Sequence, residues 1–116
     1  MSSIITKVMN RCYLCHSYKN IEIHHIYSGA FRKKSTRYGL VVPLCHECHQ
    51  GTNGVHFNRQ KMDYLRVIGQ LKFEEYYPGL DFLKVFGRNY KHIYPEIKND
   101  DEELLDLEEI DDETKK

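Results

Sequence analysis

The segment Leu40–His49, with the sequence LVVPLCHECH, runs from a short apolar stretch directly into two cysteines and a histidine. The apolar residues predict a strand over 40–44. Because Pro43 has no N–H to donate, we expect this strand to lie at a sheet edge or to end there. Cys45 and Cys48 follow as a C-x2-C pair, a spacing that lets both sulfurs reach one metal ion.

A second C-x2-C pair lies upstream, with 29 residues between the two pairs. Four thiolates suit tetrahedral Zn²⁺, so the sequence predicts one structural zinc ion. The predicted ligands are Cys12, Cys15, Cys45 and Cys48. His16 or His46 could replace one of these thiolates. Disulfides are less favoured because nothing in the sequence indicates export, and a redox pair is less favoured because no strand–helix–strand pattern surrounds either motif.

The segment between the two cysteine pairs predicts a strand and a loop. Residues 21–26 (IEIHHI) begin with apolar–polar alternation and are rich in β-branched residues, which indicates a strand. Residues 27–39 predict a loop that joins this strand to the next, and the loop is strongly basic. Its basic side chains are Arg32, Lys33, Lys34 and Arg37. These are candidates for phosphate contacts, although an ordinary solvated surface would have the same composition.

The pattern changes to helical spacing after residue 54. Residues 55–77 predict a long helix, with Thr52 or Asn53 as its N-cap and Pro78-Gly79 at its end. Its apolar stripe, predicted to face the core, is Met62, Leu65, Ile68 and Leu71. Residues 80–86 predict a short second helix that ends at Gly87, and residues 90–94 are expected to pack back onto the core.

Charge divides the chain of 116 residues into two parts. Residues 1–95 contain 14 Lys and Arg against 6 Asp and Glu, a net charge of +8, whereas residues 96–116 contain 3 against 11, a net charge of −8. We expect one basic domain over 1–95 with a polyanionic partner, and an acidic, disordered tail over 96–116. No apolar run is long enough for a membrane span or a signal peptide, so we expect a cytoplasmic protein with no membrane partner.

Six of the seven histidines lie within residues 12–57, between or beside the cysteine pairs. His24 and His25 form a doublet at the end of the first predicted strand, His49 follows Cys48, and His56 lies at the start of the predicted helix. Each alone could be a surface polar residue. Together they indicate a metal site or a general base, because imidazole serves both purposes near neutral pH. Neighbours on a strand point to opposite sides, so a bend or bulge would be needed to bring the doublet to one site.

The ordered combination of these motifs resembles a known family. Cys12-x2-Cys15, then residues 23–26 (IHHI), then residues 42–49 (VPLCHECH) are similar to the zinc-containing branch of the HNH endonucleases. In these ββα-metal nucleases two strands and a helix supply the residues that bind one catalytic ion. The resemblance covers about residues 11–58, and residues 48–56 further resemble small phage-type HNH nucleases. It implies a zinc-stapled α+β nuclease domain over residues 1–95 that hydrolyses DNA and has no small-molecule substrate.

The resemblance also implies roles for individual residues. His25 matches the family's general base, and His24 matches a ligand of the catalytic ion, which would be Mg²⁺, Mn²⁺, Ni²⁺ or Zn²⁺. His49 matches the ligand that follows the last cysteine. For the remaining ligand we favour His56, with Asn53 as the second choice.

One feature of the family is missing. The family's middle asparagine, which orients the catalytic loop through hydrogen bonds, has no counterpart, because no Asn lies between Ile26 and Thr52. The alternative function is a non-catalytic, zinc-dependent DNA-binding module, such as a degenerate nuclease. A zinc-stapled adaptor for protein interactions is a further alternative.

Overall fold

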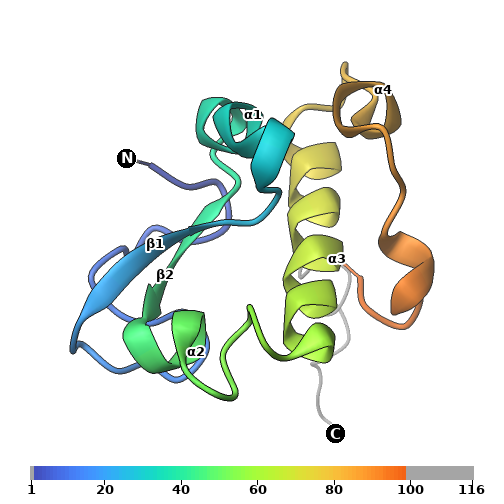
Figure 1. The fold of residues 1–116 in the computed structure, drawn as a ribbon. Helices are drawn as coiled ribbons and strands as arrows, with labels where there is room; N and C mark the ends of the chain where they lie inside the picture. The colour runs from blue at the N-terminus through green and yellow to red at the C-terminus, as the bar shows by residue number, and fades with distance from the viewer. Residues whose placement is uncertain (1, 99–116) are drawn as a thin grey trace, which may run out of the picture.

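The computed structural model describes residues 2–98, which form a small α+β fold with a two-stranded antiparallel sheet (Figure 1). The predicted α+β class is thereby confirmed. The predicted tail over residues 96–116 lies outside the described residues from 99 onward. In chain order the elements are β1 (Ile21–His25), the 3-10 helix η1 (Gly29–Phe31), α1 (Arg32–Tyr38), β2 (Val41–Cys45), α2 (His46–Gln50), α3 (Arg59–Tyr76), α4 (Phe82–Phe86) and the 3-10 helix η2 (Lys91–Ile93).

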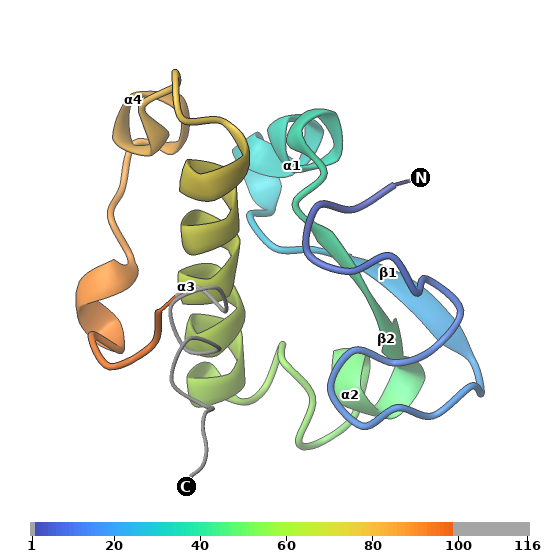
Figure 2. The same cartoon turned by 180° about the vertical axis from the view of Figure 1, so that it is seen from behind.

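The strands β1 and β2 pair antiparallel, so the start of β1 lies beside the end of β2. Ile21 lies opposite Cys45, and His25 lies opposite Val41. In the two views the sheet lies between the N-terminal segment on one side and α3 on the other (Figures 1 and 2). The N-terminal segment is held there by backbone bonds, from Ile4 N–H to the Gly39 carbonyl (2.9 Å) and from Tyr13 N–H to the Pro43 carbonyl (2.8 Å).

Aromatic rings fill the space between the sheet, α3 and α4. Phe73 on α3 is fully buried, and its ring centroid lies 5.3 Å from that of Phe82 and 5.4 Å from that of Tyr38. Aliphatic side chains from the sheet, from the residues next to its strands and from α3 complete this core, among them Ile26, Leu40, Leu44 and Leu65. Aromatic pairs at these separations add stabilisation beyond that of their buried area.

The basic segment 27–39, predicted as a loop, contains the helix α1, so this prediction was wrong. The only buried residue of α1 is the polar Ser35, so the sequence shows no apolar stripe that would predict a helix. The Ser35 hydroxyl donates to the Tyr27 carbonyl (2.6 Å) and accepts from the Tyr27 N–H (3.1 Å), which ties the helix to the end of β1. Gly39 closes α1 with φ 74°, a left-handed conformation that favours glycine.

The long helix α3 begins four residues later than predicted. Its N-cap is Asn58, whose side chain accepts a hydrogen bond from Lys61 N–H (3.1 Å), and neither Thr52 nor Asn53 has this role. The predicted apolar stripe was only partly correct. Leu65 is buried and Met62 packs against the core, but Ile68 and Leu71 are half-buried, whereas Gly69, Gln70 and Phe73 are buried. The reason is that α3 is covered on two sides, by the sheet and by the returning chain around η2 (Figure 2).

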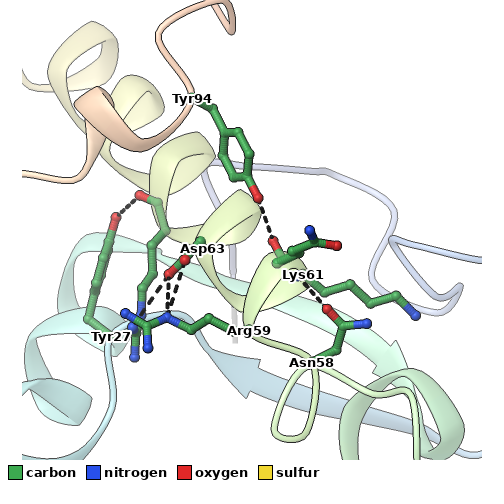
Figure 3. A network of polar contacts seen from close by, with 8 residues as sticks. Tyr27, Asn58, Arg59, Lys61, Asp63 and Tyr94 are labelled. Carbon is green, nitrogen blue, oxygen red and sulfur yellow. Dashed lines mark hydrogen bonds and ion pairs between the residues drawn. The ribbon is translucent and has the colours of Figure 1, made fainter.

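Gly69 lies inside α3, where glycine is unfavourable by about 1 kcal/mol relative to alanine. Tyr27 explains its presence. A Cβ atom on Gly69 would lie 2.7 Å from the Tyr27 hydroxyl oxygen, and this buried hydroxyl donates to the Arg66 carbonyl (2.6 Å; Figure 3). Glycine therefore lets the end of β1 approach α3 closely.

The chain after α3 follows the prediction, except that the second helix begins at Phe82 and not at Leu80. The short helix α4 has Asp81 as N-cap and ends at Gly87, which has φ 75°. Tyr90 returns to α3, where its N–H donates to the buried Gln70 side chain (2.7 Å), and the Tyr94 hydroxyl bonds the Gln60 carbonyl (3.4 Å). Within residues 2–98 no helix is both long and apolar enough to cross a membrane.

Candidate metal centres

The two cysteine pairs come together at one end of the sheet. The sulfur atoms of Cys12, Cys15, Cys45 and Cys48 all lie within 4.8 Å of one another, and all four cysteines are free. The Cys15 and Cys45 sulfurs are 3.6 Å apart. A tetrahedral zinc site with Zn–S bonds near 2.3 Å requires sulfurs about 3.8 Å apart. The group is thus of the right size and chemistry for one structural zinc ion.

Local structure presents these sulfurs. The first pair lies in a turn closed by bonds from Cys12 N–H to the Ser17 carbonyl (2.7 Å) and from His16 N–H to the Cys12 carbonyl (2.9 Å). Cys45 ends β2 and Cys48 lies in α2. Neither His16 nor His46, the alternative ligands, belongs to this group within the described chain.

The thiols differ in their tendency to ionise. Burial opposes ionisation of Cys12, but hydrogen bonds from the backbone of Cys15, Cys45 and Leu14 outweigh it and lower its pKa to about 6. At Cys48, burial and the neighbouring thiols raise the pKa. Because neighbouring sulfurs oppose one another's ionisation, four thiolates at this site would need a cation among them, and a zinc ion would provide it.

A second cluster contains three histidines. One ring nitrogen from each of His24, His49 and His56 lies within 4.8 Å of the others, and the ring centroids are 4.8–5.4 Å apart. His24 is 1% exposed, and its Nε2 atom is buried and has no hydrogen-bond partner in the described part of the chain. Burial, followed by the nearby His49 and His56, lowers the pKa of His24 to about 3. A neutral, unpartnered imidazole nitrogen facing two others fits a first-row divalent ion.

His24 and His25 line the same cavity, but their side chains have different neighbours. The cavity has a volume of ≈ 200 Å³ and is lined by Ile23, His24, His25, Ser28, Arg32, His49 and His56. His24 belongs to the histidine cluster, whereas Nε2 of His25 lies 3.0 Å from the Thr36 hydroxyl on α1. Burial, and then the Arg32 charge, lower the pKa of His25, which favours the neutral imidazole.

The loop between α2 and α3 places His56 rather than Asn53 at this cavity. Val55 N–H donates to the Cys48 carbonyl (2.8 Å) and His56 N–H to the His49 carbonyl (3.4 Å). Gly54 permits this approach, because a Cβ there would lie 2.7 Å from the Glu47 carbonyl oxygen. Asn53 is exposed, its carbonyl accepts from Lys61 Nζ (2.7 Å), and it is not among the residues lining the cavity.

Sequence analysis missed Glu22. Its carboxylate accepts hydrogen bonds from His49 Nδ1 (2.7 Å), His46 Nδ1 (2.9 Å) and Gln50 Nε2 (2.9 Å). The bonds from His46 and His49 lower the pKa of Glu22 to about 2, and the bond to Glu22 raises the pKa of His46. With Nδ1 of His49 bonded to a carboxylate, its Nε2 is the nitrogen left for a metal ion. The available signal was the two-residue spacing from Glu22 to His24, which puts both on one face of β1.

We expect Glu22→Gln to weaken metal binding at the histidine cluster by about 10- to 100-fold, the usual effect of losing such a partner. A glutamine cannot hold three donors as a carboxylate does. Titration calorimetry of zinc-loaded protein with Ni²⁺ measures this. Glu75→Gln, on exposed α3 surface, is the matched control. Equal Ni²⁺ affinities of the Glu22 variant and wild type would contradict a positioning role.

The basic side chains of α1 border a further hollow next to His25. Its volume is ≈ 560 Å³, and its lining residues are His25, Arg32, Lys33, Thr36 and Arg37. Lys34, the fourth predicted phosphate contact, instead donates from Nζ to the Val85 carbonyl (2.7 Å). Helical spacing explains the difference, because residues 32, 33, 36 and 37 share a face of α1.

Ser35 makes two hydrogen bonds close to the point where the chain leaves β1. Both of its bonds go to the Tyr27 backbone, two residues beyond His25. They tie α1 to the chain that leaves β1, near the histidine doublet.

Comparison of the chain with models of protein families, with curated proteins and with solved structures finds no match. The functional assignment therefore depends on the residues and geometry described above.

Proposed function

We propose that this protein is a metal-dependent DNA endonuclease of the HNH type, with a ββα-metal site formed by β1, β2 and α2. The observation that carries the proposal is a single cavity in which a three-histidine cluster and the separate imidazole of His25 meet. The strand β1 supplies His24 and His25, α2 supplies His49, and α2 packs against both strands.

The chemistry of phosphodiester hydrolysis matches this arrangement. A divalent ion held by His24, His49 and His56 would supply Lewis-acid stabilisation of the negative charge that develops on the phosphate. Arg32 borders both the metal cavity and the basic hollow, so it is placed to hold the phosphate backbone. His25 borders both as well, and it would accept the proton of the attacking water.

The hydrogen bonds around Thr36 indicate which nitrogen of His25 is the base. The Thr36 hydroxyl donates to the Arg32 carbonyl (3.3 Å), so its oxygen is free to accept from His25 Nε2–H (3.0 Å). His25 then keeps a lone pair on Nδ1. The tautomer is thus set by the partner of the opposite nitrogen, as is usual for histidine bases.

A plasmid-cleavage assay tests the proposal. Zinc-loaded protein is incubated with supercoiled DNA and Mg²⁺, Mn²⁺, Ni²⁺ or added Zn²⁺ in turn. We expect nicking with at least one ion. His49→Ala should lower the cleavage rate at least 100-fold, because losing one group that stabilises charge in the transition state typically costs about 10²–10³ in rate. His92→Ala, on η2, is the matched control. Absence of cleavage with all four ions would refute the nuclease.

The non-catalytic DNA-binding module stays the alternative, since the basic hollow along α1 does not depend on the histidine cluster. Such a module would bind DNA in the same assay without nicking it. Its binding would fall steeply with salt, because phosphate contacts dominate.

A further inference from the structure

A third hollow adjoins the histidine cluster at the start of α3. Its volume is ≈ 350 Å³, and its lining residues are Val55, His56, Phe57, Asn58, Arg59, Met62 and Arg66. It shares His56 with the metal cavity, and the metal cavity shares His25 and Arg32 with the basic hollow. The three hollows are therefore neighbours, and the candidate metal site lies between the basic hollow of α1 and the hollow at the start of α3.

Phe57 is the unusual feature of this hollow. Its side chain is 73% exposed, the largest exposure among the large hydrophobic residues of the described chain, and it directly follows His56. The ring also borders a neighbouring hollow with Gln50 and Thr52. An exposed aromatic ring beside a candidate metal ligand can offer a flat face to a ligand that is itself flat.

Two arginines give the same hollow a positive charge. Arg59 Nε lies 3.1 Å and 3.2 Å from the two carboxylate oxygens of Asp63, and a terminal nitrogen of Arg66 lies 4.0 Å from one of them (Figure 3). Asp63 thus holds both guanidinium groups while neutralising only one charge. The buried Nε of Arg66 has no hydrogen-bond acceptor among residues 2–98. The hollow combines an exposed ring with net positive charge, which complements a base attached to a phosphate.

We infer that Phe57, Arg59 and Arg66 form a subsite for one unpaired nucleotide of a DNA strand, next to the phosphate that is cleaved. The inference rests on the proposed function and adds its substrate class, DNA that has a single-stranded stretch. In a regular duplex each base face is covered by its neighbours. A ring can therefore stack only on a base that is unpaired or displaced.

Equilibrium binding tests the subsite without any cleavage. The probes are a single-stranded oligonucleotide containing 2-aminopurine, whose fluorescence falls on stacking, and the matched duplex, both with the His25→Ala background. We expect Phe57→Ala to weaken single-strand binding by about 5- to 150-fold, the effect of losing one stacked base. Duplex affinity should change by less than about twofold, since phosphate contacts of α1 dominate there.

Three further variants make the test specific to the ring. Phe57→Tyr should bind as wild type does and keep the fluorescence quenching, whereas Phe57→Leu, which keeps apolar bulk, should lose both. Tyr76→Ala removes another exposed ring, 63% exposed at the far end of α3, and should change nothing. Unchanged single-strand affinity in Phe57→Ala, or an equal loss for duplex, would overturn the inference.

The two proposals fail separately. If no metal supports cleavage but Phe57→Ala loses single-strand binding, the nucleotide subsite stands and the nuclease does not. If wild type cleaves DNA and Phe57→Ala binds single strands normally, the nuclease stands and the subsite does not.

Discussion

Replacing His25 with alanine should lower the cleavage rate by about 10²- to 10⁴-fold, the usual contribution of a general base. A base acts on the proton that moves in the transition state, so substrate affinity should stay nearly constant. The geometry gives the same expectation, because His25 borders the metal cavity without belonging to the three-histidine cluster. Single-turnover cleavage of a plasmid, measured beside DNA affinity, separates the two effects.

The matched control for this variant is His92→Ala, which removes a histidine outside the cavity. Metal content and thermal unfolding should match wild type in both variants, since the His25 side chain makes one hydrogen bond to the exposed Thr36. Turnover by the His25 variant within threefold of wild type would exclude His25 as the base. The metal site would then have to act with a different proton acceptor.

Cys12→Ser or Cys45→Ser should unfold the protein. Structural zinc in small domains contributes on the order of 10–16 kcal/mol, whereas a whole domain is stable by only about 5–15 kcal/mol. The effect should be global, because the cysteine group joins the N-terminal segment to β2 and α2, and α2 also presents His49. Circular dichroism during heating and metal analysis of the purified protein measure the outcome.

The chain offers two controls for the cysteine variants. His16→Ala and His46→Ala remove the alternative ligands, and both proteins should stay folded with about one tightly bound zinc ion at the cysteine group. A folded, soluble wild-type protein without zinc would contradict the structural role. Unfolding of His46→Ala together with zinc loss would instead indicate that His46 replaces a thiolate.

Much of the fold could be predicted because it depends on short-range patterns. The two C-x2-C pairs, the β-branched strand before the histidines and the short helix ending at Gly87 are local features, and the structure contains all three. Four thiols with metal-ligand spacing have few other uses in a chain this small. The sequence therefore determined the α+β class and the composition of the cysteine group by itself.

Other features depend on contacts between distant residues. The helix α1 was missed because its one buried residue, Ser35, is polar and is satisfied by the Tyr27 backbone. Gly69 looks unfavourable in α3 until Tyr27 is seen against it. Periodicity predicts a helix from a single apolar face. In α1 a hydrogen-bonded serine is buried instead of an apolar face, and α3 is covered on two sides.

The candidate site also has one part that the sequence predicts and another that depends on contacts between distant residues. Sequence alone identified His24, His25 and His49 as a chemically related set, because imidazoles beside a predicted zinc site stand out by type and spacing. The sequence also favoured His56 over Asn53 as a ligand, and the tertiary structure placed His56 and not Asn53 at the cavity. Only the tertiary structure added Glu22 behind His49 and brought Phe57 next to His56. The physical reason is that these choices depend on how the loop after α2 folds over β1. Backbone hydrogen bonds and the small volume of Gly54 set that path, and no periodic pattern of side chains records it.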